Sequence, residues 1–128
     1  MTFFNSLTWN KNRFLDLLFY TYIAVIIFLL VMPTTDDVKL NLYFLGIRTD
    51  HFIHASIFIP FLIYFRLKVK TKINSRVFFQ LYLLGIVFAV CCECLQIFVP
   101  YRTFDPADIV ANIVGISIGG ISLLWKTN

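Results

Sequence analysis

The stretch that decides the fold is VFFQLYLLGIVFAVCCECLQIFV, residues 77–99. Its most polar residues are Gln80 near its start and Glu93 and Gln96 near its end. It is long enough to cross the hydrocarbon core of a bilayer, which takes roughly 20 helical residues. An α-helix pairs its own backbone N–H and C=O groups, so we expect this stretch to be a membrane-spanning helix.

Three other apolar stretches accompany it, and together they predict helices at about 14–32, 50–66, 77–99 and 106–125. The stretch 50–66 is the shortest, and it spans a bilayer only if its polar start at Asp50 and His51 is helical and lies in the membrane interface. We therefore predict an all-α membrane protein. It is a bundle of four transmembrane helices in a single domain over residues 1–128.

The composition supports this prediction. Hydrophobic residues make up 59% of the 128 residues and charged residues 14%, against about 25% charged residues in soluble domains. A small soluble domain cannot bury that much apolar surface, which excludes a soluble globule, a disordered chain and a coiled coil. The net charge of +4 does not indicate a nucleic-acid partner, because the basic residues concentrate at 66–76, between two apolar stretches, where they contact lipid headgroups.

The distribution of basic residues also predicts the orientation. Of the eleven Lys and Arg residues, only Lys39, Arg48 and Arg102 fall in the loops 33–50 and 100–107. Loops rich in Lys and Arg stay in the cytoplasm. We therefore expect a multi-pass protein of the inner (cytoplasmic) membrane with both termini and the loop 66–76 in the cytoplasm. The first stretch lacks a cleavage site and is expected to remain as an anchor.

With this topology, polar residues collect at the outward end of the bundle. Asp50 and His54 are four residues apart, and Glu93 and Gln96 are three apart, so each pair shares one face of its helix. The second outer loop and the start of the last helix add Arg102, Asp105, Asp108 and Asn112. The pattern predicts an outward-facing polar site.

Glu93 is the most informative of these residues. It lies seven residues before Pro100, which places it roughly 10 Å inside the helix end. A carboxylate at that depth needs a proton or a partner. We expect Arg102 as its cation and His54 and Gln96 as hydrogen-bonding partners, and a purely structural ion pair remains an alternative.

Other motif residues have simpler interpretations. Asp105 followed by Pro106 is typical of a helix start, with Asp105 as the N-cap. Gly115 and Gly119 lie on one stripe with Asp108 and Asn112 and are expected to let a neighbouring helix approach closely.

No metal site is expected. Cys91 and Cys94 point largely away from the Glu93–Gln96 face, and the cysteines are expected to be small packing residues. The two histidines with the carboxylates match no zinc-ligand spacing. We therefore predict neither a metal nor a cofactor. The cysteines are Cys91, Cys92 and Cys94.

The ordered set of polar residues resembles the VanZ-like membrane protein family. The matching motifs cover about residues 50–120 and read D50-x-x-x-H54, E93-x-x-Q96 and R102-x-x-D105-x-x-D108-x-x-x-N112-x-x-G115-x-x-x-G119. The family often has Lys after the aspartate that corresponds to Asp50, where this chain has His51. The resemblance implies a small polytopic bacterial membrane protein of a family named for a member linked to teicoplanin resistance. It implies no settled reaction.

We expect the site to engage membrane lipids, specifically an anionic lipid-linked or glycan-linked ligand of the outer leaflet, with a link to glycopeptide antibiotic resistance. Arg102 would bind the anionic group, and Glu93 or His54 would donate or accept a proton. The candidate catalytic residues are Glu93, His54 and Asp108. The candidate ligand-binding residues are Arg102, Gln96, Asn112, Asp50 and Asp105. The sequence leaves catalysis and simple binding both open.

Two other functions fit the sequence. The first is a structural or assembly partner subunit, whose polar residues only lock helix packing. The second is a small proton-coupled transporter, which needs polar residues in the middle and the inner half of the membrane. There the chain offers little beyond Asp16.

Overall fold

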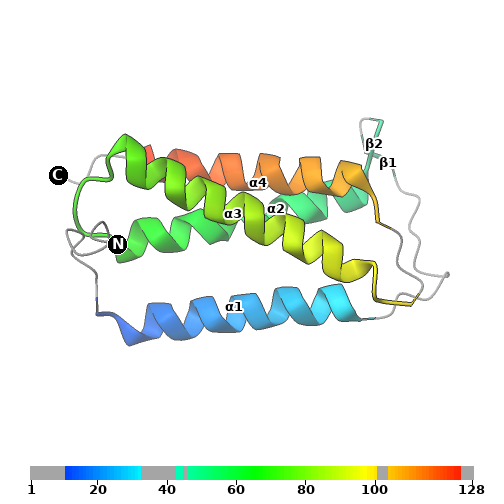
Figure 1. Ribbon diagram of the computed structural model, residues 1–128, viewed down its shortest axis with the longest axis horizontal. Coiled ribbons are helices and arrows are strands. Elements are labelled where there is room, and N and C mark those ends of the chain that lie inside the picture. Colours follow the sequence, from blue (N-terminus) through cyan, green and yellow to red (C-terminus); the bar gives the residue numbers. More distant parts are fainter. Residues whose placement is uncertain (1–10, 33–42, 45, 101–103, 125–128) are drawn as a thin grey trace.

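The computed structural model describes residues 11–32, 43–44, 46–100 and 104–124. Its helices are α1 (Arg13–Val31), α2 (Thr49–Lys68), α3 (Ser75–Gln96) and α4 (Pro106–Leu124). They run up and down along one long axis, so that α1 and α3 begin at the end where α2 and α4 finish (Figure 1). The prediction of an all-helical protein is confirmed, and each helix lies on one of the four apolar stretches.

Local signals explain where three of the helices begin. The Asn12 side chain accepts the Phe14 N–H at 3.0 Å at the start of α1, and the Asn74 side chain accepts the Val77 N–H at 2.9 Å at the start of α3. Asp105 caps α4 as predicted, because its side chain accepts the Ala107 N–H at 2.9 Å. Each cap satisfies a backbone donor that the first turn of a helix leaves without a partner.

The end of α3 differs from the prediction, since the helix stops at Gln96 rather than Val99. Beyond Gln96 the backbone hydrogen bonds change to the three-residue spacing of a 3₁₀ turn. The N–H groups of Ile97, Phe98 and Val99 each donate to the carbonyl three residues earlier. Such short-period turns are common where a helix ends. Pro100 follows directly, and the residue before a proline is disfavoured in helical conformation.

A short hairpin precedes α2 and was not predicted. Strands β1 (Tyr43–Phe44) and β2 (Ile47–Arg48) pair antiparallel, with Tyr43 opposite Arg48. Gly46 lies between them with a φ of 79°, in the left-handed region that favours glycine. Because β2 runs directly into α2, the hairpin places Arg48 at the first turn of that helix.

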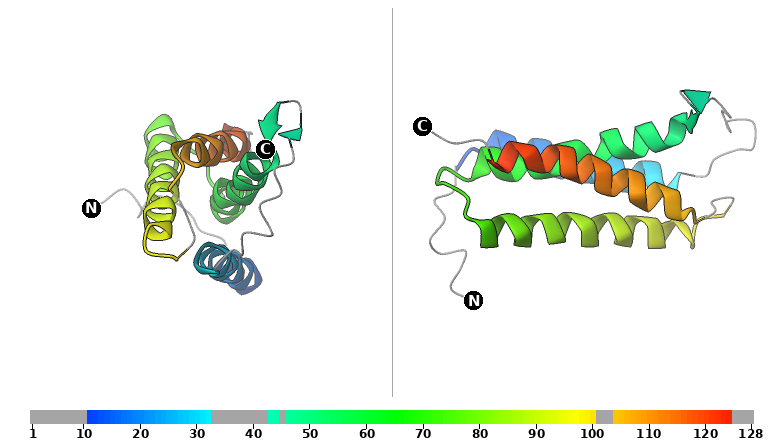
Figure 2. Two further views of the ribbon diagram at one scale, coloured as in Figure 1. Left: turned by 90° about the vertical axis from the view of Figure 1, so that its right-hand side faces the viewer. Right: turned by 90° about the horizontal axis from the view of Figure 1, so that it is seen from above.

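Helices α2 and α4 make the closest contact of the bundle. A Cβ atom on Gly115 would lie 2.0 Å from the Ala55 carbonyl oxygen, and one on Gly119 would lie 2.3 Å from the Ile59 carbonyl oxygen. The two backbones therefore touch, which confirms the predicted packing role of both glycines. Viewed along the bundle, α4 lies between α2 and α3, and α1 stands to one side (Figure 2).

The core between the helices is apolar. Phe58 and Leu62 from α2, Leu81 from α3 and Ile116 from α4 are buried. Helix α1 joins this core through the buried Ile26 and through Phe19, Tyr22 and Ile23, which pack against it.

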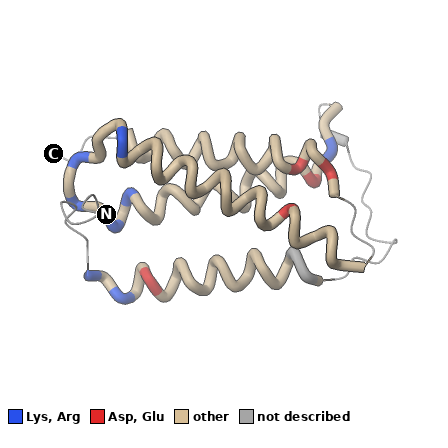
Figure 3. Tube along the Cα trace, in the orientation of Figure 1, with Lys and Arg blue, Asp and Glu red and all other residues tan. Residues whose placement is uncertain are grey.

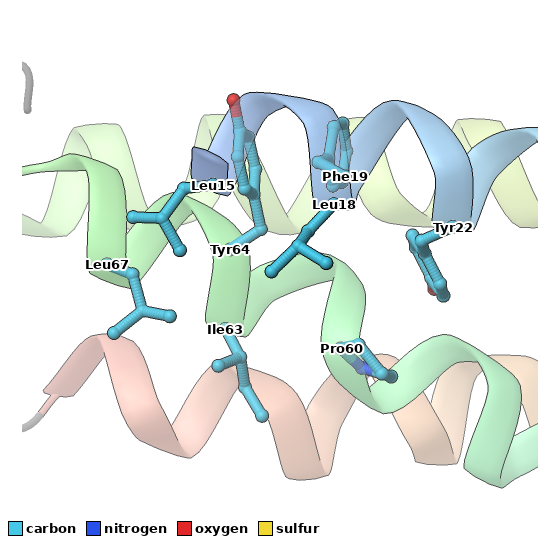
Figure 4. Close-up of a pocket in the computed structure, with 8 residues that line it drawn as sticks. All are labelled: Leu15, Leu18, Phe19, Tyr22, Pro60, Ile63, Tyr64 and Leu67. Carbon is cyan, nitrogen blue, oxygen red and sulfur yellow. The ribbon is translucent and has the colours of Figure 1, made fainter. Parts of the chain in front are cut away.

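Phe19 of α1 stacks on Tyr64 of α2 with ring centroids 3.8 Å apart, and the Tyr22 hydroxyl donates to the Ile57 carbonyl at 2.6 Å. Figure 4 shows the cavity of about 210 Å³ that remains between α1 and α2. Its walls are leucine, isoleucine, proline and aromatic side chains. Such a lining offers little for polar chemistry.

Charge divides the molecule into two ends (Figure 3). Most Lys and Arg residues lie at the basic end, where α1 and α3 begin, and most Asp and Glu residues lie at the opposite, acidic end. Among the described residues there are two exceptions. Arg48 lies at the acidic end, where it binds Asp50 and Asp105. Asp16 lies at the basic end, where it binds the buried Lys68 Nζ and accepts a hydrogen bond from the Tyr64 hydroxyl at 2.8 Å.

In the described part of the chain, α3 and α4 are long and apolar enough to cross a membrane. Only 33% and 44% of the residues in their apolar windows are buried, whereas the core helix of a soluble protein is mostly buried. The exposed apolar side chains include Phe79, Val110 and Ile121. Large exposed apolar surface marks a contact with lipid or protein, and the two helices suggest a membrane protein.

Candidate functional site

Polar side chains from three helices meet inside the acidic end of the bundle. We call this group the polar cluster. Its members are His51 and His54 from α2, Glu93 and Gln96 from α3, and Asp108 and Asn112 from α4. The close approach of α2 and α4 at Gly115 brings their first turns together.

Glu93 lies at the centre of the polar cluster, with a fully buried side chain. The Asn112 Nδ2 donates to Glu93 Oε1 at 2.7 Å. The His54 Nδ1 lies 3.4 Å from the same oxygen and 3.3 Å from Asn112 Oδ1. These three side chains therefore join α2, α3 and α4 through one group of polar contacts.

Asp108 connects the two histidines. The His51 Nδ1 lies 2.9 Å from Asp108 Oδ1, and the His54 Nε2 lies 3.7 Å from Asp108 Oδ2. His54 consequently has Glu93 beside one ring nitrogen and Asp108 beside the other. An imidazole in this position can accept a proton at one nitrogen and release one at the other, which is the chemistry of a general acid or base.

Two atoms of the polar cluster have no hydrogen-bond partner among the described residues. They are Glu93 Oε2, an acceptor, and Gln96 Nε2, a donor. Both side chains are buried and lie three residues apart on one face of α3. Buried polar atoms are nearly always bonded. A hydroxyl group or water can donate to the first atom and accept from the second.

An ion-pair group forms the rim of the polar cluster. The Arg48 guanidinium contacts Asp50 and donates to Asp105 Oδ2 at 2.9 Å, and all three side chains are partly exposed. The Ala107 N–H, and with it the Arg48 guanidinium, holds the pKa of the Asp105 carboxyl below its usual value. Asp105 is thus both a helix cap and a partner of Arg48.

The structure places most of the predicted site residues at one location. Asp50 and His54 both lie in α2, four residues apart, and Asp50 contacts Arg48 and His51. Arg102 and its predicted pairing with Glu93 lie outside the described residues. The contacts that Glu93 does show are with Asn112 and His54. The residues brought together are His54, Glu93, Gln96, Asp108 and Asn112, with Asp50 and Asp105 at the rim.

His51 was recognised as a polar residue at the start of its helix but left out of the predicted site, and Arg48 was missed. His51 lies three residues before His54, so the two share a face of α2, and this spacing is a signal that sequence reasoning could have used. Arg48 carries no such signal, because the hairpin before α2 brings it to the rim.

The cysteines stand apart from this chemistry. Cys92 is buried, Cys91 and Cys94 are exposed, and all three are free thiols. Among the described residues, the side chains close enough to hold a metal ion together are those of Asp50, His51 and Asp108.

An apolar cavity of about 400 Å³ opens beside His51, between α2 and α4. His51 is the polar side chain in its lining, so the cavity reaches the edge of the polar cluster. The other lining residues are Ile47, Phe52, Ala55, Ala107, Val110, Ala111 and Val114.

Comparison with known proteins agrees with the motif resemblance. No curated protein and no solved structure matches the chain significantly. The VanZ/LLP1 family matches residues 4–126, which is nearly the whole chain and includes every member of the polar cluster. The chain therefore belongs to the VanZ/LLP1 family of VanZ-like proteins.

Proposed function

We propose that this chain is a multi-pass protein of the cytoplasmic membrane whose polar cluster binds the headgroup of an anionic, lipid-linked or glycan-linked ligand from the extracytoplasmic side. In this proposal all four helices span the bilayer. The basic end faces the cytoplasm and the acidic end faces outward.

The two-ended charge distribution supports this orientation (Figure 3). Basic residues such as Lys70 and Lys72 are exposed at the basic end, where they would meet anionic lipid headgroups of the cytoplasmic leaflet. The exposed apolar surface of α3 and α4 lies between the two ends, where hydrocarbon would cover it.

The observation that carries the proposal is the pair of unbonded atoms inside the polar cluster, Glu93 Oε2 and Gln96 Nε2. A cluster that only locked helices together would use its hydrogen-bonding capacity fully, because each unbonded buried polar group destabilises the fold. The unbonded acceptor and donor lie in a cluster that also holds histidines and carboxylates. This arrangement favours a site that binds a polar group of a ligand.

The surroundings suggest an amphiphilic ligand. The cavity beside His51 is apolar and large enough to hold part of a hydrocarbon chain. Arg48 at the rim offers a guanidinium, which suits phosphate and carboxylate groups. The role assigned to Arg102 as an anion-binding residue stays a prediction. Glu93 and His54 would exchange protons with the ligand.

The alternative functions make different demands on the structure. A proton-coupled transporter needs polar groups between the two ends, yet the described core there is built from Phe58, Phe61, Leu62, Leu81 and Ile116. A structural partner subunit agrees with the contacts but leaves the unbonded atoms unexplained. A link to glycopeptide resistance follows from family membership and belongs to the proposal.

Lipid binding to the purified protein tests the proposal. Native mass spectrometry would compare dioleoyl phosphatidylglycerol and a polyprenyl phosphate with zwitterionic dioleoyl phosphatidylcholine. We expect the two anionic probes to bind more tightly. Arg48→Gln should weaken their binding about two- to fivefold, the range expected from losing one exposed charge contact.

Lys70→Gln is the matched control, because it also removes one exposed cation but does so at the basic end. It should leave anionic lipid binding unchanged. Equal binding of the three probes, or an equal loss in both variants, would contradict the proposal.

A further inference from the structure

We propose that Asp50, His51 and Asp108 form a binding site for a divalent transition-metal ion at the outer edge of the polar cluster. The ion would hold the anionic group of the ligand, and this use of the metal rests on the function proposed above. The metal site itself rests on geometry and charge.

The geometry brings three ligand atoms of suitable kinds together. One atom from each of the three side chains lies within 4.8 Å of the other two. The His51 Nδ1 is 2.9 Å from Asp108 Oδ1 and 3.9 Å from Asp50 Oδ1. Metal–ligand distances of about 2.0–2.2 Å allow one ion to contact all three after small side-chain shifts.

Neighbouring groups orient both carboxylates. The second oxygen of Asp50 is bound by Arg48, and the second oxygen of Asp108 lies 3.7 Å from His54 Nε2. Such outer contacts orient the ligands of protein metal sites. Of the remaining oxygens, Asp50 Oδ1 accepts the His51 backbone N–H at 3.0 Å, and Asp108 Oδ1 lies 2.9 Å from His51 Nδ1. A carboxylate oxygen has a second lone pair, so each can also bind an ion.

Charge supplies an independent argument. Four carboxylates, those of Asp50, Glu93, Asp105 and Asp108, belong to or border the polar cluster, whereas the described cation that touches this group is Arg48. The buried Glu93 keeps one oxygen without a partner, although its other oxygen lies 3.4 Å from His54. The excess of carboxylates opposes the binding of an anionic headgroup, and Arg48 offsets it only in part. A divalent cation bound there offsets part of this negative charge.

The donor set indicates the class of metal. One imidazole and two carboxylates suit Zn²⁺, Mn²⁺ or Fe²⁺ better than soft ions, which prefer thiolates. Three protein ligands leave at least one position open, as in catalytic rather than structural sites. His51 also lines the apolar cavity, so a phosphate or carboxylate on the open position would have a place for its hydrocarbon chain alongside.

Co²⁺ is the probe for the test, because its visible absorption reports its ligands. The full chain would carry Cys91→Ser, Cys92→Ala and Cys94→Ser, so that thiols do not compete. It would be stripped with a chelator in detergent, without added lipid, and titrated by calorimetry and absorbance. We expect saturable binding of one ion per chain.

The ligand variants His51→Gln and Asp50→Asn should each weaken Co²⁺ binding about tenfold or more. Asp50 is partly exposed, so Asp50→Asn should fold even if a change at the buried Asp108 does not. Asp16→Asn is the matched control, because it also removes one partly exposed carboxylate that binds a cation, but does so at the basic end. It should leave Co²⁺ binding unchanged.

Absence of saturable binding, or equal affinity in the cysteine-replaced chain and both ligand variants, would overturn the metal site. So would an equal loss in Asp16→Asn. A separate arm adds dioleoyl phosphatidylglycerol to the Co²⁺-loaded protein. If the lipid does not bind to the Co²⁺-loaded protein, that result counts against the proposed function. The Co²⁺ titration is done without lipid, so it tests the metal site separately.

Discussion

At the scale of single residues, Glu93 organises the polar cluster, because it contacts both neighbouring helices from α3. Its carboxylate is fully buried and accepts from the neutral amide of Asn112 at 2.7 Å. Burial of a carboxylate is tolerated only when hydrogen bonds or opposite charge compensate for lost water. At Glu93, one oxygen is compensated within the described chain and the other has no hydrogen-bond partner there.

Substitutions at Glu93 should separate its structural role from its chemical role. Glu93→Gln keeps a carbonyl oxygen for the Asn112 donor, so the free energy of unfolding should change by less than about 1 kcal/mol. Glu93→Leu leaves that donor buried and unbonded, which should lower the free energy of unfolding by about 1–3 kcal/mol. Denaturant unfolding in detergent, followed by circular dichroism, measures both.

Cys94→Ser serves as the control for this comparison, because Cys94 is exposed on the same helix turn. It should leave the stability unchanged. A Glu93→Leu variant as stable as the native chain would show that the contact with Asn112 contributes little to the fold.

At the scale of elements, the contact between α2 and α4 sets the geometry of the site. Gly115 and Gly119 permit backbone contact with Ala55 and Ile59. The same two helices carry the histidines and their partners, Asp108 and Asn112, within two turns of this contact toward the acidic end. The distance between the helices therefore decides whether the side chains of the polar cluster reach each other.

Adding a methyl group at this contact should be strongly destabilising. In Gly115→Ala the new Cβ would lie 2.0 Å from a backbone oxygen, which cannot move without moving α2. We expect the free energy of unfolding to fall by about 1–3 kcal/mol or more. Thermal unfolding in detergent would measure the change, and Co²⁺ or lipid binding should weaken in parallel.

Gly120→Ala is the control within the same helix. Its Cβ would lie 3.5 Å from the nearest side-chain atom, an ordinary contact. Alanine favours helices over glycine by about 1 kcal/mol, so this variant should be as stable as the native chain or slightly more stable. Equal stability of Gly115→Ala and Gly120→Ala would contradict the backbone contact.

At the scale of the whole molecule, the separation of basic and acidic ends predicts how the bundle sits in the membrane. In a chain with the native cysteines replaced, Phe104→Cys and Lys72→Cys place exposed thiols at opposite ends. A membrane-impermeant maleimide should label Phe104→Cys on intact cells, and Lys72→Cys only after the membrane is permeabilised. The reverse pattern would place the polar cluster on the cytoplasmic side.

Much of this architecture follows from the sequence alone. The four helices were predictable because their length and hydropathy are local properties of the chain. The gathering of polar residues at one end was predictable because consecutive antiparallel helices must alternate direction. The cap at Asp105 and the close packing at Gly115 were predictable because each depends on one residue type at one position.

Only the tertiary structure decided which polar side chains meet. The partners of Glu93 and of the histidines lie on other helices, between 19 and 58 residues away in the chain. Their pairing depends on how each helix is rotated about its axis and on how closely α2 approaches α4. The position of Arg48 depends on a hairpin that no periodic pattern indicates. Apolar pattern and length determine the helices, whereas the contacts among polar side chains depend on packing, which brings together residues distant in the sequence.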